Sequence, residues 1–329
     1  MCYIRSYMEH HTVLVLADPT EPQLAMLEAL PDGTGIAVGN RTDAFVRAAE
    51  DATVILQWSG SRELLRDTLA MVPGVRWVHV RSAGLDGVLF PELIESRAVL
   101  TNGRGVFSAP LGEFAIGAAL FFAKDFRRMV RNQEAGAWEQ FDVGELAGST
   151  VGILGYGDIG RAVASRARAF GMRILALRRR PKISSGDPLV DVSLGPADLP
   201  ELLAQSDYLV AAAPLTPETR GMIGDAAFGL MKPGAVLINI GRGPVVDEAA
   251  LVRALRARRI RGAALDVFEN EPLPAGHPLY SLDNVLLSPH CADHTTDWLE
   301  RAMGFFLENF KRFREARPLL NIVDKRQGY

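Results

Sequence analysis

The chain has very little cysteine: Cys2 and Cys291 are the only two among 329 residues. Two cysteines are too few for a disulfide framework or for a cysteine metal site, so neither is expected. Proteins of reducing compartments usually have this low cysteine content. The composition therefore indicates a protein of the cell interior.

The sequence also lacks a long apolar run. The longest candidate, residues 106–123, is interrupted by Ser108, Pro110 and Glu113. A membrane-spanning helix needs about 20 consecutive apolar residues. Residues 1–11 contain no apolar core of signal-peptide length. We therefore expect a cytoplasmic protein with no membrane partner.

An excess of charge of either sign is missing as well. Lysine and arginine number 36 and aspartate and glutamate 39, a net charge of −3, so we expect no nucleic-acid partner. The hydrophobic content of 48% and the charged content of 23% are ordinary for a globular protein. The 329 residues are enough for about two domains, each with its own core.

One glycine-rich stretch, residues 150–161, organises the chain. An apolar run of strand length precedes Gly155, Gly157 and Gly160, and residues 161–170 then carry apolar side chains at helical spacing. A strand, a G-x-G-x-x-G turn and a helix in this order predict a dinucleotide site, with the phosphates at the helix N-terminus. We place the following residues in that site: Gly155, Tyr156, Gly157, Asp158, Ile159 and Gly160.

The end of the next predicted strand bears on the choice of dinucleotide. NAD sites usually have an acidic residue there, whereas this chain has Arg178, Arg179 and Arg180. Arginine binds phosphate oxygens with two hydrogen bonds, so we expect NADP(H) to be preferred, with NAD(H) as the second option. The alternative is a solvated basic loop.

Short apolar runs alternate with amphipathic segments along the whole chain, which predicts an α/β protein with parallel sheets. We expect two domains, both Rossmann-like or flavodoxin-like, with a cleft between them. Residues 1–107 and 298–329 would form a discontinuous substrate-binding domain, and residues 108–297 an NAD(P)-binding Rossmann domain. Strands are predicted at 12–17, 53–56, 75–80, 98–100, 151–154, 174–177, 208–213, 235–240, 262–267 and 284–287. Helices are predicted at 22–30, 62–71, 109–122, 161–170, 199–204, 248–257 and 295–315, with residues 127–139 as a polar connection.

Four polar side chains follow predicted strands of the second domain: Arg242, Asp266, Glu271 and His290. Ligands bind outside the carboxyl ends of the strands in an open parallel sheet, so we expect these residues to converge. Hydride transfer between a nicotinamide and a carbonyl needs a proton donor, which histidine can be near neutral pH, and a carboxylate to orient its ring. Arginine can bind the substrate's carboxylate. Taken singly, each residue is better explained by a structural role; only their joint position favours catalysis.

Five stretches, in this order, resemble the D-isomer-specific 2-hydroxyacid dehydrogenases, and the resemblance covers nearly the whole chain. They are residues 151–160 (VGILGYGDIG), 214–219 (PLTPET), 231–243 (MKPGAVLINIGRG), 265–273 (LDVFENEPL) and 288–290 (SPH). The resemblance implies interconversion of a small 2-keto acid and its D-2-hydroxy acid, with NADP-linked glyoxylate and hydroxypyruvate reductases as the most similar type. It also implies a homodimer that needs no metal.

The resemblance assigns roles to individual residues. Arg242 resembles the substrate-binding arginine, Glu271 and His290 the acid–base pair, and Asp266 the residue that holds the nicotinamide carboxamide. The backbone N–H groups of three residues would bind the substrate's carboxylate: Ser82, Ala83 and Gly84. We place these further residues in the cofactor site: Ala213, Pro214, Thr219, Ile240, Gly241 and His290.

Two residues depart from the family pattern or stand out beside it. Asp293 replaces a small uncharged residue, and it either tunes specificity or pairs with His294. Trp58 follows a predicted strand and is expected to pack in the core rather than to wall the substrate pocket.

Two other functions stay open. One is a dehydrogenase of an unusual anionic substrate, such as a keto acid bearing a phosphonate, which Arg81 and Arg104 could meet. The other is a co-repressor-like protein that senses the dinucleotide. Formate dehydrogenases pair the histidine with glutamine, so Glu271 argues against that reaction.

Overall fold

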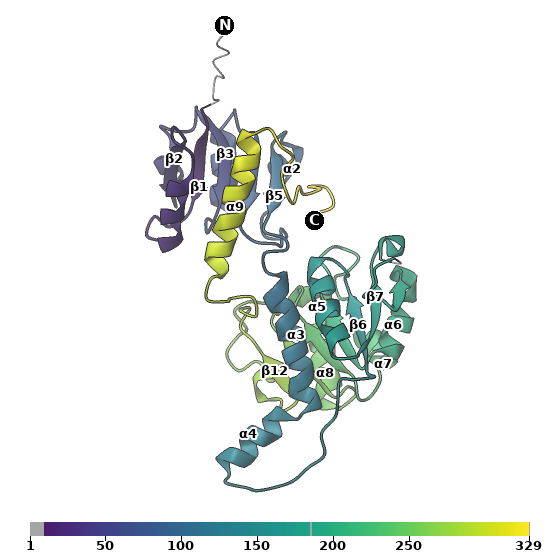
Figure 1. Cartoon of the computed structure of the whole chain (residues 1–329). Helices are drawn as coiled ribbons and strands as arrows, with labels where there is room; N and C mark the ends of the chain where they lie inside the picture. The colour runs from purple at the N-terminus through teal and green to yellow at the C-terminus, as the bar shows by residue number, and fades with distance from the viewer. Residues whose placement is uncertain (1–9, 185, 329) are drawn as a thin grey trace. The chain divides into compact units, whose positions relative to one another are not determined.

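The computed structural model describes residues 10–184 and 186–328, and Cys2 lies outside them. The chain divides into two compact units, shown in Figure 1. Unit 1 comprises the described parts of Met1–Val106 and Thr296–Tyr329, and unit 2 comprises Phe107–Thr295.

Unit 1 is built on a parallel sheet of five strands in the order β2-β1-β3-β4-β5, the flavodoxin-like order. The strands are β1 (Thr12–Leu16), β2 (Gly35–Gly39), β3 (Ala52–Gln57), β4 (Trp77–Val80) and β5 (Val99–Asn102). The central strands are buried on both faces, as a sheet covered by other elements requires.

Helices and short 3-10 turns cover this sheet: η1 (Pro22–Ala29), η2 (Thr42–Phe45), α1 (Arg62–Met71), α2 (Pro91–Glu95) and α9 (Trp298–Arg314). Helix α1 begins after Ser61, whose hydroxyl accepts the N–H of Leu64. Helix α9 buries Phe306 and Phe310 against the sheet, and Phe306 stacks on Trp77 with 5.4 Å between ring centroids (Figure 1). The last helix of the chain therefore belongs to the core of unit 1.

Unit 2 is built on a parallel sheet of seven strands in the order β12-β11-β10-β9-β6-β7-β8. The strands are β6 (Thr150–Leu154), β7 (Arg173–Leu177), β8 (Val192–Leu194), β9 (Tyr208–Ala211), β10 (Val236–Asn239), β11 (Gly262–Leu265) and β12 (Val285–Leu287). This is the Rossmann order with one strand added, and the strand order reverses between β6 and β9. The glycine-rich turn follows β6, directly at that switch point.

The helices and 3-10 turns of unit 2 are α3 (Ser108–Ala123), α4 (Phe126–Glu134), α5 (Asp158–Ala169), η3 (Pro181–Ile183), η4 (Pro196–Asp198), α6 (Leu199–Gln205), α7 (Asp225–Leu230), η5 (Gly243–Val245), α8 (Glu248–Arg256) and η6 (Pro278–Ser281). Helices α3 and α5 lie so close that a Cβ at Gly112 would stand 3.0 Å from the Ala162 carbonyl oxygen. Among the described helices, none is both long and apolar enough to cross a bilayer.

The predicted α/β class with two parallel sheets is confirmed. Several predicted elements were wrong in detail. Residues 22–30 form the 3-10 turn η1 rather than an α-helix, and most of the connection 127–139 belongs to α4. Strands β2 and β8 were missed, and both are edge strands of their sheets.

Candidate functional site

The backbone of the glycine-rich turn leaves room for a ligand at one position. Gly155 has φ +96°, and a Cβ on it would stand 2.5 Å from the Ala213 nitrogen. A Cβ on Gly160 would stand 2.5 Å from the Gly155 oxygen, whereas nothing lies within 4 Å of one on Gly157. The open side at Gly157 faces the start of α5, where free N–H groups favour phosphates. The turn therefore fits a dinucleotide.

The carboxylate of Asp187, which the sequence analysis did not identify, lies beside this turn. Asp187 Oδ2 accepts hydrogen bonds from the Tyr156 hydroxyl at 3.0 Å and from Arg161 Nε at 2.9 Å. Burial acts to raise the pKa of Asp187, but hydrogen bonds from Leu189, Arg161 and Tyr156 outweigh it and the pKa is lowered. The turn sequence around Asp187 gave no sign of this long-range contact.

The arginines after β7 differ in exposure: Arg178 is half-buried, while Arg179 and Arg180 are exposed. The pKa of Glu218 is lowered mainly by a hydrogen bond from Thr216, and also by the charge of Arg179. The arginine run thus lies near the turn after β9.

That turn and the next one are close-packed. The Thr219 hydroxyl donates to the Pro214 oxygen at 2.7 Å. Ala213 and Ile240 are buried, and a Cβ on Gly241 would stand 2.9 Å from the Ala213 oxygen. The structure therefore brings the predicted cofactor residues of β6, β9 and β10 together.

The predicted acid–base pair is in contact. His290 Nδ1 lies 2.6 Å from Glu271 Oε2, and Glu271 Oε1 accepts the Phe268 N–H at 2.9 Å. The second bond fixes the carboxylate that orients the ring. The His290 side chain is 47% exposed, and within the described part of the chain its Nε2 has no hydrogen-bond partner. The imidazole is thus held at one nitrogen and accessible at the other.

The loop that carries His290 is anchored by Asp266. Asp266 Oδ1 accepts three hydrogen bonds, from Ser288 Oγ at 2.5 Å and from the N–H groups of Cys291 and Ala292 at 3.0 Å each. His290 itself has φ +52°, in the left-handed region that is uncommon for residues other than glycine. The buried carboxylate therefore stabilises a strained backbone at the imidazole.

Arg242 lies on the turn after β10, and β10 is the neighbour of β11 in the sheet. Its Nη1 donates to the Gly241 oxygen at 2.8 Å, and its own oxygen accepts from Asn239 Nδ2 at 3.2 Å. The following residue, Gly243, touches the Phe268 backbone, because a Cβ there would stand 1.8 Å from the Phe268 oxygen. The turn with Arg242 thus packs against the loop that leads to Glu271.

Asp293 lies near two histidines. His294 Nε2 is 3.8 Å from Asp293 Oδ1, so the predicted pairing with His294 is present. Burial raises the pKa of Asp293, while His294 and, more weakly, His290 act to lower it. In the described residues, no three His, Cys, Asp or Glu side chains are grouped to hold a metal ion.

The predicted substrate loop lies in unit 1, after β4, whereas the other site residues lie in unit 2. Ser82 Oγ donates to the Gly84 oxygen at 2.8 Å, and Asn102 Nδ2 donates to the Ala83 oxygen at 2.6 Å. Trp58 is only 2% exposed, which confirms that it packs in the core.

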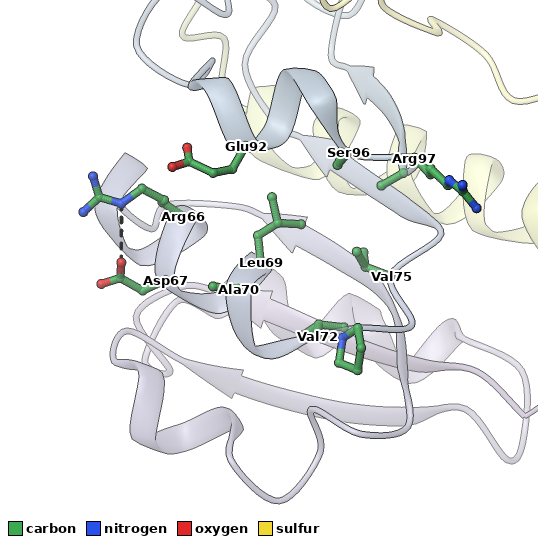
Figure 2. Close-up of a pocket in the computed structure, with 11 residues that line it drawn as sticks. Arg66, Asp67, Leu69, Ala70, Val72, Val75, Glu92, Ser96 and Arg97 are labelled. Atoms are coloured by element: carbon green, nitrogen blue, oxygen red, sulfur yellow. Dashed lines mark ion pairs between the residues drawn. The ribbon is translucent and has the colours of Figure 1, made fainter.

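Unit 1 also has a hollow of about 570 Å³ between α1 and α2. Figure 2 shows Arg66 and Leu69 on the side of α1 and Glu92 and Ser96 on the side of α2. Arg66 and Asp67 form an ion pair of 3.5 Å at its rim. The residues that line this hollow include none of the predicted site residues.

Comparisons with known proteins place the chain among dehydrogenases and reductases of one family. The family model described as D-isomer specific 2-hydroxyacid dehydrogenase, NAD binding domain, matches residues 116–292. The chain is 31% identical over 318 residues to D-3-phosphoglycerate dehydrogenase of Methanocaldococcus jannaschii, covering 94% of this chain but only 59% of that protein. It is 37% identical over 270 residues to glyoxylate reductase of Aeropyrum pernix, covering 79% of each.

A solved structure is similar over almost the whole length. It is the D-isomer specific 2-hydroxyacid dehydrogenase from Xanthobacter autotrophicus Py2, in complex with NADPH and MES. The TM-score is 0.83 at 32% identity, covering 98% of this chain and 100% of that one. The family model, the identities and the shared fold lead to one conclusion. The chain belongs to the D-isomer-specific 2-hydroxyacid dehydrogenase family.

Proposed function

We propose that this protein is an NADP(H)-dependent reductase of a small 2-keto acid that forms the D-2-hydroxy acid. The observation that carries the proposal is the 2.6 Å contact between Glu271 and His290, which leaves Nε2 of the imidazole accessible. The relatives named glyoxylate reductase and D-3-phosphoglycerate dehydrogenase support an oxidoreductase of this class. They favour it over a dinucleotide-sensing co-repressor and over a dehydrogenase of an unrelated anion.

The cofactor's nicotinamide supplies the hydride when bound. The turn 155–160 and the start of α5 would hold the pyrophosphate, and Asp266 the nicotinamide carboxamide. The turns after β9 and β10 would line the rest of the cofactor site. Arg178, Arg179 and Arg180 would bind the 2′-phosphate of NADP(H), and the Xanthobacter relative crystallised with NADPH supports this preference.

His290 would move the proton in this reaction. Its Nε2 donates to the carbonyl oxygen of the keto acid as negative charge develops there, and it takes the proton back in the reverse direction. Glu271 keeps Nδ1 protonated and the ring in place. Arg242 would bind the substrate's carboxylate together with the N–H groups of Ser82, Ala83 and Gly84.

Initial rates of NADPH and NADH oxidation with glyoxylate, hydroxypyruvate, pyruvate and phenylpyruvate test the proposal. We expect turnover with NADPH favoured over NADH. Turnover favouring NADH would keep the enzyme class and reject the arginine argument. The absence of turnover with either cofactor would reject the function itself.

The arginine argument has a direct test in binding. Arg178→Gln should raise the Kd for NADPH about 10-fold and leave the Kd for NADH unchanged, because only NADPH carries the phosphate. Arg173→Gln is the matched control, since Arg173 starts the same strand and bonds Gln205 Oε1 at 2.8 Å. Equal Kd changes for both cofactors in Arg178→Gln would contradict the argument.

We also propose that the protein is a homodimer. Large apolar side chains on α4 and the segment after it are exposed, and Trp138 is 95% exposed. The others are Phe126, Met129, Val130 and Val143. Exposed apolar surface of this kind is typical of an interface. Sedimentation equilibrium should give twice the mass of the chain, and Trp138→Ser should weaken the dimer.

A cytoplasmic location and the absence of nucleic-acid and membrane partners stay predictions.

A further inference from the structure

Arg81 is the first residue after β4, and its side chain packs against two indole rings of unit 1. Its Cζ lies 5.0 Å from the ring centroid of Trp58 and 5.3 Å from that of Trp298. Trp58 follows β3, while Trp298 opens α9. Three separate elements therefore combine to hold one guanidinium at the carboxyl-terminal edge of the sheet.

No described residue accepts a hydrogen bond from this guanidinium. Among the residues that the structure describes, Arg81 makes no side-chain hydrogen bond and no ion pair within 4.0 Å. The acid whose charge acts on it, Glu21, is engaged elsewhere: its Oε2 accepts from Trp58 Nε1 at 2.6 Å and its Oε1 accepts from the Ser59 hydroxyl. Burial lowers the pKa of Arg81, which shows that its environment is partly desolvated.

A guanidinium has five N–H donors, and leaving them without an acceptor in a partly desolvated environment costs free energy. Aromatic faces attract the cation but offer no acceptor in the plane of the guanidinium. Arg104, the other arginine near this edge, differs: its Nη2 donates to Asn321 Oδ1 at 3.4 Å. Arg81 is thus held in position with its hydrogen-bonding capacity still unused.

The position of Arg81 indicates which ligand accepts hydrogen bonds from its guanidinium. It directly precedes Ser82, Ala83 and Gly84, and ligands bind at the carboxyl-terminal edge of an open parallel sheet. If those N–H groups bind the carboxylate beside the keto group, the adjacent guanidinium is within reach of the far end of the same substrate. Guanidinium and carboxylate match in a bidentate pair.

We propose that Arg81 is a specificity-determining residue that binds a second, side-chain carboxylate of the substrate, so that dicarboxylic 2-keto acids are preferred. The proposal rests on the proposed function. The Glu21 carboxylate offsets part of the positive charge, and a singly charged carboxylate therefore suits this place better than a doubly charged phosphate or phosphonate.

The test compares substrates that differ only in the terminal group. 2-Oxoglutarate is paired with 2-oxopentanoate, and oxaloacetate with 2-oxobutyrate. We expect a higher kcat/KM for the dicarboxylic member of at least one pair. Arg81→Gln should lower that kcat/KM about 10- to 100-fold, mostly through KM, and change the monocarboxylic partner less than 3-fold, because a hydrogen bond to a charged group is lost only in the first case.

Arg76→Gln is the matched control. Arg76 precedes the same strand at its other end, and its Cζ lies 5.2 Å from the Phe313 ring centroid. This variant also loses a cation–π contact, so its stability should fall like that of Arg81→Gln, but its substrate preference should stay that of the wild type. A change of preference in both variants would make the effect structural and overturn the proposal.

The remaining outcomes separate this proposal from the function it rests on. Equal use of both members of each pair by the wild type, with turnover intact, overturns the role of Arg81 alone. A preference for 3-phosphonopyruvate over oxaloacetate overturns the assignment to a carboxylate. No turnover of any keto acid overturns the proposed function and the role of Arg81 together.

Discussion

At the carboxyl-terminal edge of the unit 2 sheet, the polar side chains are bonded to one another, whereas at the same edge of the unit 1 sheet a guanidinium packs against aromatic rings. Asp266 holds the loop of His290 with three hydrogen bonds, and Glu271 holds its ring. Arg81 is held by Trp58 and Trp298 without any acceptor in the described protein.

The difference separates two tasks. Groups that move a proton need a fixed geometry before the substrate arrives, and buried hydrogen bonds provide it. A group that selects a substrate must keep its hydrogen-bonding capacity for the ligand, and aromatic packing can fix its position without using that capacity. Breaking the two arrangements should therefore affect kcat in unit 2 and KM in unit 1.

Removing the imidazole should have the largest effect. His290→Ala should lower kcat about 10²- to 10⁴-fold, because general acid catalysis is lost, while NADPH binding measured by calorimetry survives. The neighbouring His294→Ala is the control and should keep kcat within about 3-fold, since a half-exposed ion pair such as that of His294 with Asp293 is worth little. Retained turnover in His290→Ala would reject the mechanism.

Loosening the loop beneath the imidazole should have a smaller effect on kcat, and for Asp266 also an effect on the Kd for NADPH, because this carboxylate is the proposed partner of the nicotinamide carboxamide. Ser288→Ala removes one of the three bonds to Asp266 Oδ1 and should lower kcat about 2- to 10-fold, the value of one hydrogen bond. Asp266→Ala removes all three and should lower kcat about 10- to 100-fold or more. Stopped-flow single turnovers with NADPH would measure this. A change in the Kd for NADPH with kcat unchanged would assign Asp266 to cofactor binding alone.

Much of this edge could be predicted from the sequence because strand ends of a parallel sheet meet. Glu271 and His290 lie in the loops after two neighbouring strands, β11 and β12, and this topology favours their contact. The contacts of Asp187 with Tyr156 and of Arg81 with Trp298 depend instead on loop paths between distant segments. No local pattern encodes such paths.

The helices and strands that were missed have a weaker hydrophobic pattern than those that were predicted. Helix α1 was predicted with its observed bounds, because its apolar residues keep helical spacing; the structure adds the cap by Ser61. Strands β2 and β8 lie at sheet edges, where only one side is paired and burial is partial, so their hydrophobic pattern is weak. Helix α4 buries none of its residues, and its mostly polar composition led to the prediction of a connection there.

The core of unit 1 also holds a polar side chain in place: His79 of β4 lies buried under α9. Trp77 Nε1 donates to Thr101 Oγ1 at 2.8 Å, and Thr101 Oγ1 lies 2.7 Å from His79 Nδ1. Thr101 Oγ1 thus accepts from the indole N–H, and its own proton is available to an unprotonated His79 Nδ1. Burial lowers the pKa of His79 to about 3.

This buried histidine predicts the smallest effect, which appears only in acid. Between the folded pKa of about 3 and an unfolded value of about 6.5, the unfolded chain binds a proton that the folded chain does not. The free energy of unfolding of unit 1 should therefore fall by about 1.4 kcal/mol for each pH unit below 6.5 from this group.

In His79→Asn, whose amide oxygen can still accept from Thr101, the slope of the free energy of unfolding against pH should be shallower by that amount. Urea titrations followed by tryptophan fluorescence measure it, because Trp58, Trp77 and Trp298 all lie in unit 1. Identical slopes for both proteins would show that His79 is protonated in the folded state and that burial does not lower its pKa.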